Sequence, residues 1–158
     1  MINAFSTIPA HGFLMTISYP PPSSRRILLV VAAAMFDREG RVLIAQRPAH
    51  KMLGGLWEFP GGKIDPGESP EAALVRELKE ELDVTVEPDC LDPYAFASHS
   101  YADFHLLMPL YAVHAWRGTP LPREAQALAW AYPVELRNHK MPPADGPLVE
   151  QIIARTAR

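Results

Sequence analysis

The stretch that most limits what this chain can fold into runs from residue 61 to residue 84 and reads GGKIDPGESPEAALVRELKEELDV. It opens with two glycines and a turn, and it then becomes a helical pattern. Ser69, Pro70 and Glu71 are typical of a helix start: a side-chain cap, a proline at the first helical position, and an acid that suits the positive end of the helix dipole. The stretch therefore predicts a loop of special backbone geometry that leads straight into a helix.

One face of this helix is apolar. Val75, Leu78 and Leu82 recur at helical spacing, and Ala72 and Leu74 lie beside them. This periodicity predicts that the helix packs against a core along these residues.

Three carboxylates lie along the flank of the same helix. Glu77, Glu80 and Glu81 are spaced i, i+3 and i+4, so their heads are expected to converge within one turn. Like charges at this spacing repel each other unless a cation joins them, and Mg2+ or Mn2+ prefers such oxygen ligands. The alternative is a solvated acidic face without a ligand. The glycine loop, the neighbouring Arg76 and the further acid Glu68 favour the metal interpretation.

The spacing of these residues resembles the Nudix box, G-x5-E-x7-R-E-U-x-E-E-x-G-U, in which U is a bulky aliphatic residue. The late glycine of that pattern is Asp83 here; Asp tolerates the left-handed turn that the glycine makes, so we interpret it as a helix-cap variant. The other fixed positions of the pattern are matched by Gly62, Glu68, Arg76, Glu77, Leu78, Glu80, Glu81 and Val84, and Leu82 takes the variable position before Asp83.

Composition sets the remaining limits. The chain has 158 residues, enough for one domain with a substantial core, and we expect a flexible leader at 1–25 and a single domain at 26–158. Its net charge of -3 without a basic stripe argues against a nucleic-acid polymer as partner. Its single cysteine, Cys90, fits a reducing compartment, and no apolar run is long enough to span a membrane. We therefore expect a cytoplasmic monomer or weak homodimer, and Met15 is an alternative start to Met1.

The rest of the chain reads as strands and one closing helix. The apolar run 27–36 and the segment 41–47 are predicted to form a hairpin, and short strands are expected at 84–86 and 128–132. Two longer strands are predicted at 94–100 and 105–116, and a helix at 147–157. These elements predict an α/β protein of the α+β type with a mixed sheet between helices, the architecture that the Nudix resemblance also implies.

Beyond the box, the chain is similar to the MutT type of nucleoside triphosphate pyrophosphohydrolase over about residues 27–155. Three features carry this likeness: Arg47 shortly before the box, the segment WEFPGGK at residues 57–63, and the acid Asp145 behind a double proline. The likeness implies a Mg2+-dependent enzyme that attacks the β phosphorus, with Mn2+ as a substitute, and that releases a nucleoside monophosphate and pyrophosphate.

The resemblance also assigns roles to residues. Glu80 and Glu81 are expected to hold the metal with the Gly61 carbonyl, and Glu77 to bind it or to orient the attacking water. Arg76 and Glu68 are expected to pair and to orient the glutamates. Glu124 matches a late loop acid that serves as ligand or base, with a plain loop charge as the alternative. The expected substrate contacts are Lys63 and Arg47 on phosphate oxygens, Phe59 on the substrate, and Asp145 on the base.

The base stays open at this point. Enzymes of the MutT type that act on oxidised guanine carry Asn where this chain has Asp145; an ionised Asp accepts only, whereas a protonated Asp imitates Asn. We rank an oxidised purine such as 8-oxo-dGTP slightly ahead of CTP or a modified dCTP. Asp145 as a mere helix cap is the simpler alternative. A non-catalytic module that binds a modified base is a rival of another class, and the intact glutamate set argues against it.

Overall fold

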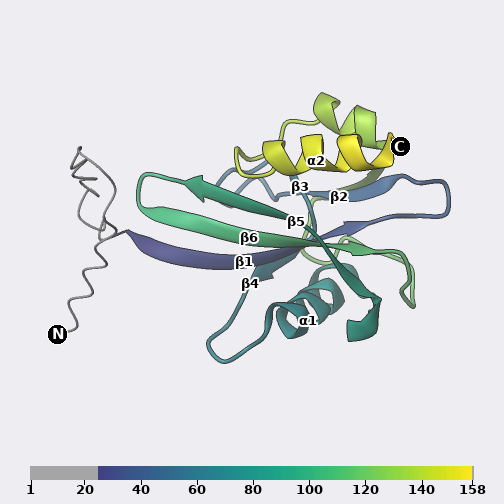
Figure 1. Ribbon diagram of the computed structural model, residues 1–158, viewed down its shortest axis with the longest axis horizontal. Coiled ribbons are helices and arrows are strands. Elements are labelled where there is room, and N and C mark those ends of the chain that lie inside the picture. Colours follow the sequence, from purple (N-terminus) through teal and green to yellow (C-terminus); the bar gives the residue numbers. More distant parts are fainter. Residues whose placement is uncertain (1–24, 158) are drawn as a thin grey trace, which may run out of the picture.

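The computed structural model describes residues 25–157, so the predicted leader at 1–25 and the alternative start at Met15 lie outside the described residues, apart from Arg25. Two α-helices and seven strands make up most of the described chain, joined by loops and two 3-10 turns (Figure 1). In chain order they are β1 (Arg26–Met35), β2 (Val42–Gln46), β3 (Trp57–Glu58), β4 (Gly61–Lys63), α1 (Pro70–Leu82), η1 (Pro88–Cys90), β5 (Leu91–Ser100), β6 (Phe104–Val113), β7 (Ala127–Ala131), η2 (Pro133–Asn138) and α2 (Gly146–Thr156).

The strands form two sheets. The larger sheet has the order β4-β1-β6-β5; β1 and β6 run parallel and its other pairs run antiparallel. The smaller sheet, β3-β2-β7, is antiparallel throughout. Helix α1 covers one side of the large sheet and α2 lies on the other side (Figure 1). This is the α+β architecture with a mixed sheet between helices that the sequence predicts.

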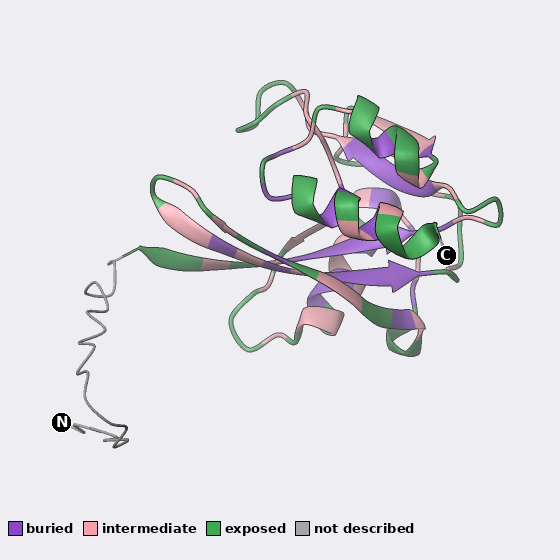
Figure 2. Cartoon of the chain, turned by 45° about the horizontal axis from the view of Figure 1, so that its top comes forward, coloured by how far each residue is buried: buried purple, intermediate pink, exposed green. Residues whose placement is uncertain are grey.

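Strand β1 separates two apolar cores. Its residues point alternately to the two faces of the sheet. Val31, Ala33 and Met35 pack in the core that α1 covers, and Ala32 and Ala34 pack in the core that α2 covers. All five are almost fully buried, which explains why the second half of the run is apolar on both faces, whereas the first half of β1 is exposed or half-buried (Figure 2).

Helix α1 begins and ends as the sequence predicts. The Ser69 hydroxyl accepts a hydrogen bond from the Ala72 N–H at 3.1 Å, and Pro70 takes the first position. At the other end, Asp83 adopts the left-handed conformation with φ 58° and ψ 30°, and its N–H donates to the Lys79 carbonyl. The substitution of the box glycine by aspartate therefore keeps the turn that glycine makes.

The predicted apolar face of α1 is rotated slightly from the expected one. Ala72 is exposed and Val75 is only half-buried, because the stripe that faces the sheet is centred one residue away from both. The fully buried residues of the helix are Ala73, Leu74, Leu78 and Leu82.

The hairpin predicted from 27–36 and 41–47 is wrong. The two segments share a single bridge, Phe36 to Val42, and then diverge into different sheets. β1 uses its edges for β4 and β6, so β2 pairs with β3 and β7 instead. The strand predicted at 84–86 is also reduced to one bridge, Thr85 to Arg117.

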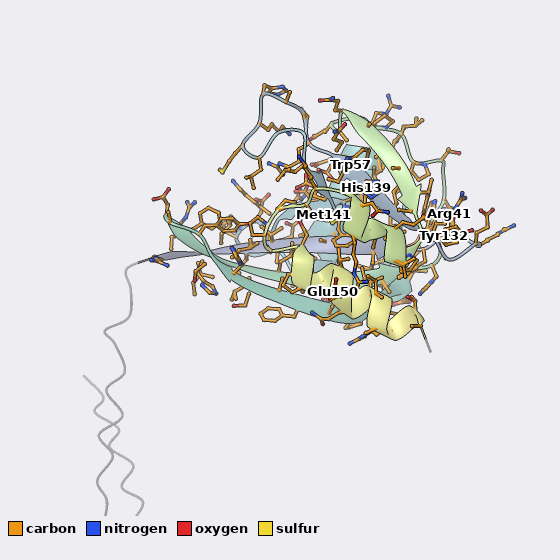
Figure 3. The ribbon with its side chains drawn as sticks, turned by 90° about the horizontal axis from the view of Figure 1, so that it is seen from above. Arg41, Trp57, Tyr132, His139, Met141 and Glu150 are labelled. Atoms are coloured by element: carbon orange, nitrogen blue, oxygen red, sulfur yellow. The ribbon has the colours of Figure 1, made fainter. Side chains whose placement is uncertain are left out.

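Strand β3 is held by contacts to the segment that precedes α2. The Trp57 N–H donates to the Lys140 carbonyl at 2.8 Å, and the indole meets the His139 ring edge-on with centroids 5.3 Å apart (Figure 3). Trp57 is thus a packing residue, and its neighbour Glu58 points to the other face of the strand. No helix among residues 25–157 is long and apolar enough to cross a membrane.

Candidate active site

A cleft of about 570 Å³ opens between the large sheet and the loops that follow β2 and β6. This volume lies in the range of small-molecule sites. The cleft brings together the predicted residues Arg47, Phe59, Gly61, Lys63, Glu77, Glu81, Glu124 and Asp145. The other three predicted residues, Glu68, Arg76 and Glu80, lie outside its lining.

The glycine pair of β4 lets helix α1 approach the sheet. Gly61 has φ 153°, and a side chain there would collide with the Val31 carbonyl of β1. A side chain on Gly62 would occupy the space that the Glu77 carboxylate fills. The Gly61 N–H donates to a carboxylate oxygen of Glu81 at 3.1 Å. The two glycines therefore determine where two of the helix carboxylates stand.

Arg76 organises the outer side of this arrangement. Its Nε and Nη2 donate to the two oxygens of Glu68 at 2.9 Å each, and its Nη1 donates to Glu77 at 2.7 Å. Its Nη2 also donates to the Lys63 carbonyl at 3.1 Å. The guanidinium beside Glu68 lowers the pKa of that carboxyl. Arg76 thus joins the glycine loop to the helix and holds Glu77 toward the cleft.

Glu81 is the carboxyl most affected by its surroundings. Burial raises its pKa to about 8, against the opposing effect of the Gly61 N–H, and the negative charges of Glu58, Glu77 and Glu124 raise it further. In the lining of the cleft, six carboxyl groups outnumber three cationic side chains: Glu58, Asp65, Glu77, Glu81, Glu124 and Asp145 against Arg47, Lys51 and Lys63. That excess suits a divalent cation, which prefers carboxylate oxygens.

The three box carboxylates do not converge as their helical spacing predicts. Glu77 and Glu80 both accept from the Arg76 Nη1, at 2.7 Å and 3.4 Å, with half of the Glu80 side chain exposed, whereas Glu81 accepts from the Gly61 N–H. The Arg76 cation offsets the repulsion between Glu77 and Glu80, and the third carboxylate bonds the glycine loop instead. Within residues 25–157, no three His, Cys, Asp or Glu side chains form a group that could hold a metal ion. The donor chemistry fits a hard cation, although the carboxylates stand apart.

Glu58 is a site residue that the sequence analysis missed. Its carboxylate accepts from the Arg47 Nη1 at 2.6 Å, and the Arg47 Nε donates to the Met52 carbonyl at 2.9 Å. Burial raises the pKa of Glu58 and the bond to Arg47 opposes this rise. The signal was available: alternation along β3 places Glu58 opposite the packed Trp57, which is the side of the cleft.

Asp145 stands at the start of α2 but does not cap it. Its backbone is helical and its side chain makes no capping hydrogen bond, so the simpler alternative of a helix cap is wrong. The residue is 4% exposed, and its place in the lining of the cleft is shared with Arg47 and Glu58. Burial raises the pKa of Asp145 to about 8, with a further rise from the charge of Glu58 and a smaller opposing effect of Arg47. The carboxyl is therefore mostly protonated at neutral pH.

Glu124 enters the cleft from the loop between β6 and β7. Its carboxylate lies 3.6 Å from the Lys51 ammonium, which belongs to the loop between β2 and β3. Both side chains are about half exposed. Glu124 is thus a charge at the mouth of the cleft that acts on the buried Glu81.

A cleft of this volume, lined by carboxylates that a glycine pair positions, by lysine and arginine side chains and by a buried acid, suits the hydrolysis of a phosphoric anhydride. Comparison with known proteins agrees with this class. The profile of the NUDIX domain matches residues 31–151, which is more than half of the chain. This protein belongs to the Nudix family and is a hydrolase of nucleotide phosphoric anhydride bonds, of the MutT-like type. Nudix hydrolases generally need a divalent metal ion.

Individual relatives extend the likeness. The CTP pyrophosphohydrolase of Escherichia coli K12 is 43% identical over 129 residues, which cover 80% of this chain and 93% of that protein. The 8-oxo-dGTP diphosphatase of the same organism is 33% identical over 116 residues, covering 73% and 88%. The solution structure of the E. coli ORF135 protein superposes with a TM-score of 0.76 at 39% identity, covering 88% of this chain and 98% of that chain.

Proposed function

We propose that this protein hydrolyses a nucleoside triphosphate to the monophosphate and pyrophosphate, and that it thereby removes damaged nucleotides, first of all 8-oxo-dGTP, from the cellular pool. The observation that carries the choice of base is the burial of Asp145 in the lining of the cleft, which raises the pKa of this carboxyl to about 8 and so favours its neutral form. A neutral carboxyl presents one O–H donor beside one carbonyl acceptor, as the amide of Asn does. It can therefore pair with the N1–H and O6 edge of an oxidised guanine.

Cytosine is the second candidate base. Its N4 amino group and N3 also present a donor beside an acceptor, so the same neutral carboxyl can pair with it. The observation that favours it is the 43% identity with a relative whose name is CTP pyrophosphohydrolase. CTP and modified dCTP therefore compete with 8-oxo-dGTP in this proposal.

The proposed cofactor is Mg2+, with Mn2+ as a substitute, held by Glu77, Glu80, Glu81, Glu124 and the Gly61 carbonyl. When bound, the cation supplies a Lewis acid for the phosphoryl oxygens and activates water.

Three side chains of the protein are assigned to the substrate. Lys63 lines the glutamate end of the cleft and is assigned to phosphate oxygens. Arg47 donates to the Glu58 carboxylate, and its charge opposes the rise in the pKa of Asp145. We therefore assign Arg47 to the base end of the cleft as well as to phosphate. Phe59, 4% exposed, closes the cleft from the core side and orients the substrate by packing.

The working unit in this proposal is a single catalytic domain at residues 26–158 behind a leader. It acts in the cytoplasm, as a monomer or weak homodimer, where its nucleotide substrates are.

The test is the release of pyrophosphate and orthophosphate with Mg2+ from a panel: dGTP, 8-oxo-dGTP, CTP, dCTP, 5-methyl-dCTP, ADP-ribose and a dinucleoside polyphosphate. We expect pyrophosphate from 8-oxo-dGTP with a kcat/KM at least about a hundredfold above that for dGTP. A higher efficiency with a cytosine triphosphate assigns the second candidate instead. Pyrophosphate from none of the triphosphates overturns the proposal.

A further inference from the structure

The residue that departs from the Nudix box has a second set of contacts. Asp83 stands where the box has glycine, and its left-handed φ of 58° does that glycine's work in ending α1. Unlike glycine, it also presents a carboxylate. One oxygen accepts from the Lys79 ammonium at 2.6 Å, and the other accepts from the Arg123 Nη2 at 2.8 Å. The carboxylate therefore joins the end of the catalytic helix to the loop between β6 and β7.

The backbone of that loop is anchored at the same place. The Arg123 N–H donates to the Glu81 carbonyl at 3.0 Å, and the Leu121 N–H donates to the Leu82 carbonyl at 2.9 Å. These carbonyls belong to the last turn of α1, which has no partners of its own for them. The loop thus caps the helix that carries Glu81, and the next residue after Arg123 is Glu124.

We infer that the Asp83–Arg123 ion pair is a positioning device that holds Glu124 in register with Glu81 across the mouth of the cleft. This inference rests on the proposed role of Glu124 in the hydrolysis. The ion pair is exposed, with 36% of the Asp83 side chain and 57% of the Arg123 side chain accessible, so its effect on stability is small. Its effect is geometric: it restricts the residue that precedes Glu124, whose carboxylate otherwise has only the Lys51 ammonium, 3.6 Å away, as an ionic partner among the described residues.

Two variants remove the pair from opposite sides. Asp83→Gly restores the glycine of the family pattern, which suits the left-handed turn better than aspartate does, so its Tm should equal or exceed that of the unaltered protein. Arg123→Gln removes the cation. We expect each variant to lower kcat about tenfold with KM nearly unchanged, because a displaced Glu124 affects the transition state. Arg123→Lys should recover part of the loss.

The matched control is Arg117→Gln. Arg117 lies at the start of the same loop and pairs with Glu87 in an exposed ion pair. Its loss should leave kcat as it is. An Arg117→Gln variant as slow as Arg123→Gln would show that any loosening of the loop suffices, and would overturn a specific role of the Asp83–Arg123 pair.

The decisive experiment is a double-mutant cycle with Glu124→Gln, measured as pyrophosphate release from the best substrate of the panel. If Arg123 acts through Glu124, then Arg123→Gln changes kcat in the unaltered protein but not in the Glu124→Gln background. Equal losses in both backgrounds overturn the inference, and so does a Glu124→Gln variant of full activity. The proposed function is tested separately: it requires that the unaltered protein releases pyrophosphate, whatever the variants of the ion pair do.

Discussion

Asp145 offers a direct test of the energetics of the cleft. Burial raises the pKa of this carboxyl from 3.8 to about 8 in the folded protein. Between these values the folded state holds a proton that the unfolded chain has lost. The contribution of Asp145 to the free energy of unfolding is therefore fully present below about pH 4, falls as the pH rises, and is lost by the time the pH has passed about 8.

The magnitude follows from the linkage relation. Each pH unit inside this window is worth about 1.4 kcal/mol, so two units, from about pH 5.5 to about pH 7.5, should lower the stability by about 2 to 3 kcal/mol. The side chain is 4% exposed, so solvent screening reduces this value little. Asp145→Asn keeps the shape and donor-acceptor pair of the neutral acid but does not titrate.

The assay is urea unfolding of both proteins, with EDTA present, at the two pH values. Other titrating groups contribute almost equally to the two proteins, so the difference between the two free energies of unfolding should change by about 2 to 3 kcal/mol. If the two stability curves run parallel across this window, Asp145 ionises normally in the folded protein. In that case Asp145 is ionised at neutral pH and cannot imitate an amide toward the base.

Three further substitutions test the site and the core. Glu81→Gln should lower kcat more than about a hundredfold while far-UV circular dichroism and Tm stay near those of the unaltered protein; a normal turnover number rules out the assigned metal role. Gly62→Ala places a methyl group where the Glu77 carboxylate lies, so pyrophosphate release should fall at least about tenfold, and unchanged kinetics would contradict the described packing. Leu78→Ala removes a fully buried side chain, with 0% exposure, and should reduce the free energy of unfolding in urea titrations by about 2 to 5 kcal/mol. A loss below about 1 kcal/mol would mean that the core on the α1 side is less tightly packed than described.

Local features of the fold follow from the sequence because local chemistry determines them. The cap at Ser69, the left-handed turn at Asp83 and the alternation along β1 each depend on residues within a few positions of one another. Pairing between strands does not. The run 27–36 has apolar residues on both faces, so nothing in it shows that β4 and β6 are its neighbours or that β2 leaves for a second sheet.

The candidate site shows the same division. The pairing of Arg76 with Glu68, which is bidentate in the structure, was expected from the family resemblance. The separation of Glu81 from Glu77 and Glu80 was not expected, because helical spacing determines where side chains start, whereas the donors that they meet, Arg76 and the Gly61 N–H, determine where they end. The burial of Asp145 likewise depends on segments far apart in the chain, so a single sequence could state its two protonation states but could not choose between them.

The division of the molecule by β1 has a consequence for how such an enzyme can diversify. Glu77 and Glu81 belong to α1, which packs on one core, whereas Glu58 belongs to β3 and Asp145 directly precedes α2, which packs on the other core. In the proposed function, the contacts to the base thus lie on the α2 side, where substitutions leave the packing of α1 on its own core unchanged. If the proposed function holds, laboratory selection for a new base should concentrate its mutations on the α2 side, and mutations concentrated on α1 would contradict this division.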